Sequence, residues 1–182
     1  MADRLPGIRP RPTLGRKLDS ASRHAFPGAC TALLMLLAGA PLGLPAQAQL
    51  LPAITLACVF FWSVFRPGSM PPPLVFVLGL LADLLGLAQP GTGVLTLLLA
   101  QGMALRWRPF FVRQQFALVW LLFVVVAAGA SLLGYLLTCV LTLRLLPAGA
   151  ALFQFTLTAG LYPLLAFLFT AAHRSIADPE RA

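Results

Sequence analysis

Six runs of apolar residues, separated by short breaks that contain proline, glycine or arginine, make up most of this 182-residue chain. Several of the runs approach or exceed the roughly 20 residues that cross a bilayer as a helix. Almost all of their side chains are uncharged. The pattern therefore predicts an all-α integral membrane protein with six transmembrane helices. By residue number, the predicted helices cover 27–44, 50–65, 71–88, 94–105, a part of 114–143, and 150–172.

The third and fourth runs could instead form one helix, because together they extend over 32 residues, 74–105. Such a helix would be about 48 Å long, which exceeds a hydrocarbon core of roughly 30 Å. A Gln-Pro-Gly-Thr-Gly segment at 89–93 lies between the runs, and proline flanked by glycines breaks a helix. We therefore predict two helices joined by a turn.

The basic residues give a second argument for six helices. If the N-terminus is cytoplasmic, 12 of the 13 lysines and arginines fall on the cytoplasmic side, and only Arg144 lies outside. Fusing the third and fourth helices would place eight inside and five outside. The positive-inside rule thus favours six helices with both termini in the cytoplasm.

Composition supports this class and excludes others. Hydrophobic residues make up 59% of the chain, charged residues only 10%, and the mean hydropathy is +0.89. Soluble domains carry about 25% charged residues. The net charge of +8 is confined to the tail and loops, where a lipid bilayer explains it better than nucleic acid.

The chain divides into three predicted parts. Residues 1–26 are rich in arginine and proline and are predicted to be a disordered basic cytoplasmic tail. Residues 27–173 form the six-helix domain, and 174–182 a short cytoplasmic tail. A cleavable signal peptide ending at Ala46-Gln47-Ala48 is the competing interpretation of the N-terminus.

The sequence offers little catalytic or metal-binding chemistry. Cys30, Cys58 and Cys139 lie in apolar runs and are interpreted as small hydrophobic residues. His24 and His173 fall at the edges of the predicted membrane domain. Because a membrane enzyme needs several polar groups converging on its substrate, we predict no catalytic residue, no cofactor site and no metal site.

Asp83 is the exception, because it is the only acidic residue between Asp19 and Asp178. A charge in the middle of a bilayer costs roughly 2.5–3.5 kcal/mol, so an acidic residue there is a functional candidate by default. Helical spacing places Phe76, Gly79, Asp83 and Gly86 on one face of the third helix. Small residues let another helix approach, and a polar group can hydrogen-bond across the contact.

Three interpretations of Asp83 remain open. It could contact a partner helix or act in a conformational switch, or it could form an internal hydrogen bond between the third and fourth helices. A proton or substrate site of a transporter is the third. Burial without a nearby cation favours the neutral carboxyl, which would donate a hydrogen bond to a glutamine or to the backbone around Pro90.

The segment 61–93 resembles the rod shape-determining MreD family. The resemblance rests on Phe61-Trp62, Arg66-Pro67, a Phe76-x-x-Gly79-x-x-x-Asp83-Leu-Leu pattern and the glycines that follow at 91–93. It implies a location in the bacterial cytoplasmic (inner) membrane and a non-catalytic scaffold of the cell-wall elongation complex, which maintains rod shape. The implied partners are an MreC-type single-span shape protein, the MreB-type actin-like cytoskeleton and the elongation peptidoglycan synthases.

The alternative is the substrate-binding membrane subunit of a small-molecule, vitamin-type uptake transporter, whose six-helix S-component fold is similar in architecture. Arg66 and Pro67 are interpreted as a turn with a topology charge, or as a cytoplasmic docking point. The basic and aromatic loop 106–113 is expected to anchor in lipid headgroups or to dock a partner.

Overall fold

The computed structural model describes residues 14–40, 47–86, 90–111, 115–144 and 147–177. These residues form six α-helices and one short 3₁₀-helix, with no β-strand among them. The elements are α1 (Leu14–Gly39), α2 (Gln47–Phe65), η1 (Pro67–Ser69), α3 (Pro72–Gly86), α4 (Thr92–Phe111), α5 (Phe116–Thr142) and α6 (Gly149–Ala177). The all-α prediction is confirmed for this part of the chain.

Three helices are long and apolar enough to cross a membrane: α2, α5, and the Gly149–Thr170 part of α6. Ala25–Gly39 of α1 and the whole of α3 are apolar but shorter. The described helices therefore have the character of a membrane protein. The helix α5 has 27 residues, which corresponds to about 40 Å and requires tilting in a bilayer.

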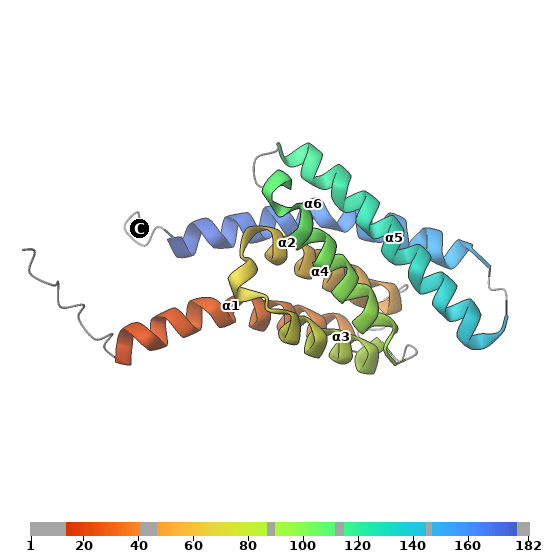
Figure 1. Ribbon diagram of the computed structural model, residues 1–182, viewed down its shortest axis with the longest axis horizontal. Coiled ribbons are helices and arrows are strands. Elements are labelled where there is room, and N and C mark those ends of the chain that lie inside the picture. Colours follow the sequence, from red (N-terminus) through yellow and green to blue (C-terminus); the bar gives the residue numbers. More distant parts are fainter. Residues whose placement is uncertain (1–13, 41–46, 87–89, 112–114, 145–146, 178–182) are drawn as a thin grey trace, which may run out of the picture.

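The helix α2 lies at the centre of the bundle, and it packs against α1, α3, α4 and α6. Of its most apolar stretch 67% is buried, compared with 22% for α5. Figure 1 shows α1 beginning and α6 ending at the same side of the molecule, whereas α3 and α5 end on the opposite side.

Aromatic side chains join α2 to the two long C-terminal helices. The Phe60 ring lies 5.1 Å from that of Phe123 in α5 and 5.8 Å from that of Tyr162 in α6. Phe123 and Tyr162 are themselves stacked at 4.1 Å. Edge-to-face and offset-stacked ring pairs stabilise a core beyond their buried area, so these three rings fix the positions of α5 and α6.

The helix α1 begins earlier than predicted. Residues 14–26, which are predicted to belong to a disordered tail, are helical and continuous with the apolar part of α1; residues 1–13 lie outside the described chain. Pro27 was interpreted as a helix start, but it lies inside the helix. Proline is tolerated within transmembrane helices. One turn after Pro27, the Thr31 hydroxyl donates an additional hydrogen bond to the Pro27 carbonyl at 2.8 Å.

The helix α4 extends further than predicted. It continues through Pro109 to Phe111, so residues 106–111 are the end of a helix and not a loop. The loop prediction rested on the basic and aromatic composition of this segment, which does not by itself end a helix. Residues 112–114 lie outside the described part of the chain. The predicted break between α3 and α4 is confirmed: two separate helices flank a turn at Pro90 and Gly91.

Candidate functional site: the α3–α4 hairpin and the cavity beside it

Asp83 joins α3 to the start of α4. Its side chain is 5% exposed. The Gly91 N–H donates to Oδ2 at 2.8 Å, and the Gly93 N–H donates to Oδ1 at 2.8 Å. The Val94 N–H is a longer third donor, 3.4 Å from Oδ2. Asp83 therefore acts as an N-terminal cap of α4 that is supplied by the preceding helix.

The first turn of α4 needs such an acceptor. The N–H groups at the start of a helix have no carbonyl partner within that helix, and the aligned peptide dipoles leave partial positive charge there. An unpaired backbone N–H is expensive where no water is available. One carboxyl group with two acceptor oxygens offsets both the missing bonds and the partial charge.

Two glycines allow α3 and α4 to approach closely enough for this contact. A Cβ atom on Gly79 would lie 2.7 Å from the Cα of Val94, which is impossible without moving the helices apart. A Cβ on Gly93 would collide with the Asp83 carboxyl group. Gly91 adopts φ +94° in the turn, a backbone conformation that favours glycine. Gly79, Gly93 and Gly91 are thus each required for a separate physical reason.

The four residues predicted to share one face of α3 do not share one environment. Gly79 and Asp83 are buried, together with Val75 and Leu78. Phe76 is 49% exposed, because it lies at the margin of the buried arc and turns outward. Gly86 is also exposed and lies at the end of the helix. The part of the small-residue face formed by Gly79 and Asp83, which the sequence offers for partner binding, is covered by α4.

The hydrogen bonds that the structure contains at Asp83 differ from the one expected. A neutral carboxyl was expected to donate, whereas both oxygens accept from backbone N–H groups. The location near Pro90 is correct. Of the interpretations left open, the internal link between the third and fourth helices is the one that the structure contains.

Arg66 and Pro67 lie at the opposite end of α3, where α2 ends and η1 begins. Two α4 side chains hold this corner. Arg108 Nε donates to the Val64 carbonyl at 2.9 Å, and Gln101 Nε2 donates to the Met70 carbonyl at 2.7 Å. Gln101 is 2% exposed, so its bond satisfies a carbonyl that water does not reach. Both side chains therefore orient the chain around the Arg66–Pro67 turn.

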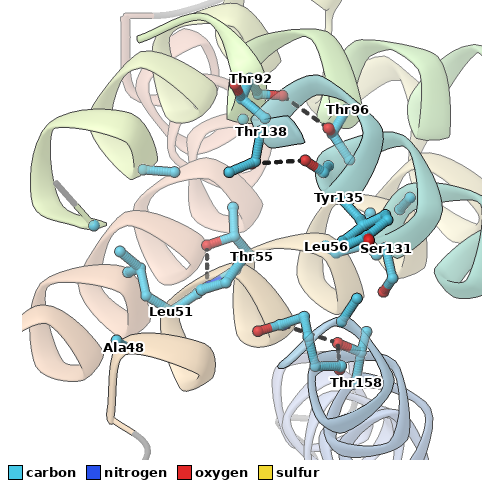
Figure 2. A pocket seen from close by; sticks show the side chains of 18 of the residues that line it. Ala48, Leu51, Thr55, Leu56, Thr92, Thr96, Ser131, Tyr135, Thr138 and Thr158 are labelled. Carbon is cyan, nitrogen blue, oxygen red and sulfur yellow. Dashed lines mark hydrogen bonds between the residues drawn. The ribbon is translucent and has the colours of Figure 1, made fainter. Parts of the chain in front are cut away.

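A cavity of about 330 Å³ lies beside Asp83, between α2, the α3–α4 turn, α5 and α6. Its polar lining residues are Thr55, Asp83, Thr92, Thr96, Ser131, Tyr135, Thr138, Gln154 and Thr158. Figure 2 shows labelled hydroxyl side chains of α2, α4, α5 and α6 around this one space. The lining comes from the helix halves opposite Arg66, near the connection that carries Arg144.

Four threonines of the lining donate their hydroxyl protons to hydrogen bonds within their own helices. Each donates to the carbonyl four residues earlier, at distances of 2.6–2.8 Å: Thr55 to Leu51, Thr96 to Thr92, Thr138 to Gly134, and Thr158 to Gln154. A hydroxyl oxygen keeps acceptor lone pairs after donating its proton. The cavity therefore presents acceptors on several sides.

The sequence contains a clear local signal for the hairpin but only a weak one for the cavity. A buried acid six residues before the segment 89–93 predicts a cap once the break is accepted. The cavity brings together threonines and tyrosine from four helices that are far apart in the chain, and each of them alone is an ordinary residue of a transmembrane helix. No cluster of three or more metal-ligating side chains occurs among the described residues.

Comparison with protein families, with curated proteins and with solved structures finds no match to this chain.

Proposed function

We propose that this chain is a six-span protein of the bacterial inner membrane and a non-catalytic scaffold of the cell-wall elongation complex. In this role it would bind an MreC-type single-span protein and position peptidoglycan synthases near an MreB-type cytoskeleton. The resemblance of residues 61–93 to the MreD family motivates the proposal. The observation that carries it is that the described parts of this segment, 61–86 and 90–93, form one unit with α4.

This unit extends from the end of α2 to the first turn of α4. It is closed at one end by Asp83 and its three backbone donors, and at the other by Arg108 and Gln101. The residues that carry the resemblance thus include those that fix the geometry of α3. A scaffold requires a rigid helix that presents a constant surface to its partners.

The outward face of α3 is the partner surface that this proposal requires, because α4 covers the small-residue face. The outward side chains are apolar, and they are 43–67% exposed: Phe76, Val77, Leu80 and Leu84. The helix α3 has only 15 residues, about 22 Å, which is shorter than a hydrocarbon core of roughly 30 Å. Association with a longer partner helix is one way to relieve such a mismatch.

The distribution of charges supports one proposed orientation in the membrane. Arg108 lies against the end of α2, next to Arg66, whereas Arg144 follows α5 at the other end of the bundle. The positive-inside rule then places the Arg66 end in the cytoplasm and the α5–α6 connection outside. The cavity would lie in the outer half of the membrane domain.

Co-purification from native membranes tests the scaffold. The double variant Phe76→Ala/Leu84→Ala should lose the single-span shape protein, since it removes two large side chains from the outward face of α3. The matched control is Leu132→Ala/Leu136→Ala, on an outward face of α5 with similar exposure. The proposal fails if no cell-wall protein is recovered with the wild type, or if the α3 variant recovers the same partners as the control.

The cavity favours a second candidate function, the substrate-binding subunit of a small-molecule uptake transporter. A cavity between helices, in the predicted outer half, is where a solute captured from outside would bind. Mass spectrometry of the purified protein separates the two candidates. A stoichiometric bound small molecule of one mass favours uptake, whereas co-purified wall-synthesis proteins favour the scaffold.

A further inference from the structure

We propose that the cavity between α2, α4, α5 and α6 binds an uncharged, largely apolar small molecule that carries at least one hydroxyl or amide N–H donor. The proposal does not rest on the scaffold function, since a scaffold can hold such a ligand or lack it. It would specify the ligand class of the second candidate function.

The size of the cavity is the first argument. Its volume of about 330 Å³ falls at the lower end of the 300–1,000 Å³ range of ligand pockets. Leucine, alanine, proline and glycine supply most of the remaining lining beside the polar residues. A pocket with apolar walls and a few polar groups selects ligands of the same mixed character.

The hydrogen-bonding state of the walls is the second argument. The hydroxyls of Thr55, Thr96 and Thr138 each donate to a carbonyl of their own helix. Their oxygens can therefore only accept from a ligand. Since a buried acceptor is costly when it lacks a donor, a ligand with O–H or N–H groups is favoured over one without.

The absence of an available counter-charge is the third argument. No lysine, arginine or histidine occurs among the described residues that line the cavity, so a buried anion would lack a cationic partner. Asp83 is the only acidic one, and three backbone N–H groups already occupy its oxygens. A cation would have to compete with the α4 cap. A charged ligand would thus pay its desolvation cost without an ion pair.

Two glycines of α5 allow a matched pair of variants, one that fills the cavity and one that leaves it unchanged. Gly134 lines it, and a Cβ on Gly134 would meet no atom within 4 Å. Leucine at this position would extend into space that the cavity supplies. Gly129 lies five residues earlier on the same helix, also has open space around its Cβ, and does not line the cavity. Gly134→Leu and Gly129→Leu make the same chemical change to the same helix.

The experiment uses ligand-observed fluorine NMR on the full-length protein in one non-ionic detergent. The probes share a fluorophenyl ring: 2-(4-fluorophenyl)ethanol, 1-ethyl-4-fluorobenzene, 2-(4-fluorophenyl)ethylamine and 4-fluorophenylacetate. We expect saturable binding of the alcohol to the wild type and to Gly129→Leu. Affinity should be about tenfold lower for the charged probes, and also for the ethyl compound, which lacks the donor.

Gly134→Leu should abolish saturable binding of the alcohol while the protein stays folded by circular dichroism. If Gly134→Leu does not fold, Thr96→Val is the second variant, because it keeps the side-chain volume and removes an acceptor. It should lower the affinity for the alcohol about threefold or more. The proposal is overturned if the alcohol does not saturate the wild type, or if a charged probe binds better. It is also overturned if folded Gly134→Leu binds the alcohol as the wild type does, because the signal would then come from partition of the alcohol into detergent.

Discussion

Asp83 Oδ1 accepts a hydrogen bond from the Gly93 N–H at 2.8 Å, and the same carboxyl group occupies the space that a Cβ on Gly93 would need. The acid and the glycine therefore depend on each other. Without the glycine the carboxyl cannot reach the helix end, and without the carboxyl the first turn of α4 loses its acceptor. This mutual dependence explains an acidic residue inside an apolar helix without a charged partner.

Gly93→Ala should destabilise the protein, although alanine is the better helix former. The added methyl collides with the Asp83 carboxyl group, and overpacking of this kind costs about 1–3 kcal/mol. Gly102→Ala is the control on the same helix, since a Cβ there meets no atom within 4 Å and should leave stability unchanged or raise it by about 0.5–1 kcal/mol. Thermal unfolding in detergent measures both. Equal midpoints for the two variants would contradict the proposed contact.

Asp83→Asn and Asp83→Leu should weaken the α4 cap to different degrees. Asparagine keeps one acceptor oxygen, whereas leucine leaves the Gly91 and Gly93 N–H groups unpaired, at about 1–3 kcal/mol for each. Hydrogen exchange at the start of α4 should therefore rise in the order wild type, Asn, Leu. Exchange in the middle of α4 is the internal control. Unchanged exchange at Gly91–Val94 in the leucine variant would refute the cap.

The sequence allowed prediction of the hairpin but not of its internal chemistry. Helical spacing placed Gly79 and Asp83 together, and the segment 89–93 located the break, because both depend on local sequence. The direction of the hydrogen bonds depends on how closely two helices approach, which single-helix periodicity does not contain. Phe76 was assigned to the buried face for the same reason: without knowing where α4 lies, the limits of that face are uncertain by about one residue.

The ends of the helices were the least predictable part of the fold. The sequence predicts a helix that begins at residue 27, whereas α1 continues through Pro27, because transmembrane helices tolerate an internal proline. The loop predicted at 106–113 rests on basic and aromatic composition, which does not by itself end a helix, and α4 continues to Phe111. The cavity could not be predicted, because its lining requires the relative positions of four helices.

Gly79→Ala should separate α3 from α4. The new Cβ would lie 2.7 Å from the Val94 Cα, a backbone atom that can move only with its helix. We expect a loss of about 1–3 kcal/mol and faster exchange at the start of α4, as for the Asp83 variants. Gly86→Ala is the control, because its Cβ would meet only a flexible Leu51 side chain, at 3.4 Å. A Gly79 variant as stable as this control would contradict the close approach.

Gln101→Leu should destabilise the other end of the hairpin. It removes the 2.7 Å bond from Gln101 to the Met70 carbonyl and leaves a buried acceptor unpaired, at about 1–3 kcal/mol. Met103→Leu on the same helix is the control, since Met103 is 41% exposed and the change conserves volume. Thermal unfolding compares them. Loss of stability in the control alone would show that α4 is not held through Gln101.

Cysteine labelling tests the six-span orientation directly. In a background with Cys30, Cys58 and Cys139 replaced by alanine, Gly68→Cys lies in the exposed α2–α3 turn and Leu143→Cys at a position 90% exposed after α5. The positive-inside rule places the first in the cytoplasm and the second outside. A membrane-impermeant maleimide should therefore label Leu143→Cys in intact cells, and Gly68→Cys only after permeabilisation. Labelling of both positions in intact cells, or the reverse pattern, would refute this orientation and with it the outward-facing position of the cavity.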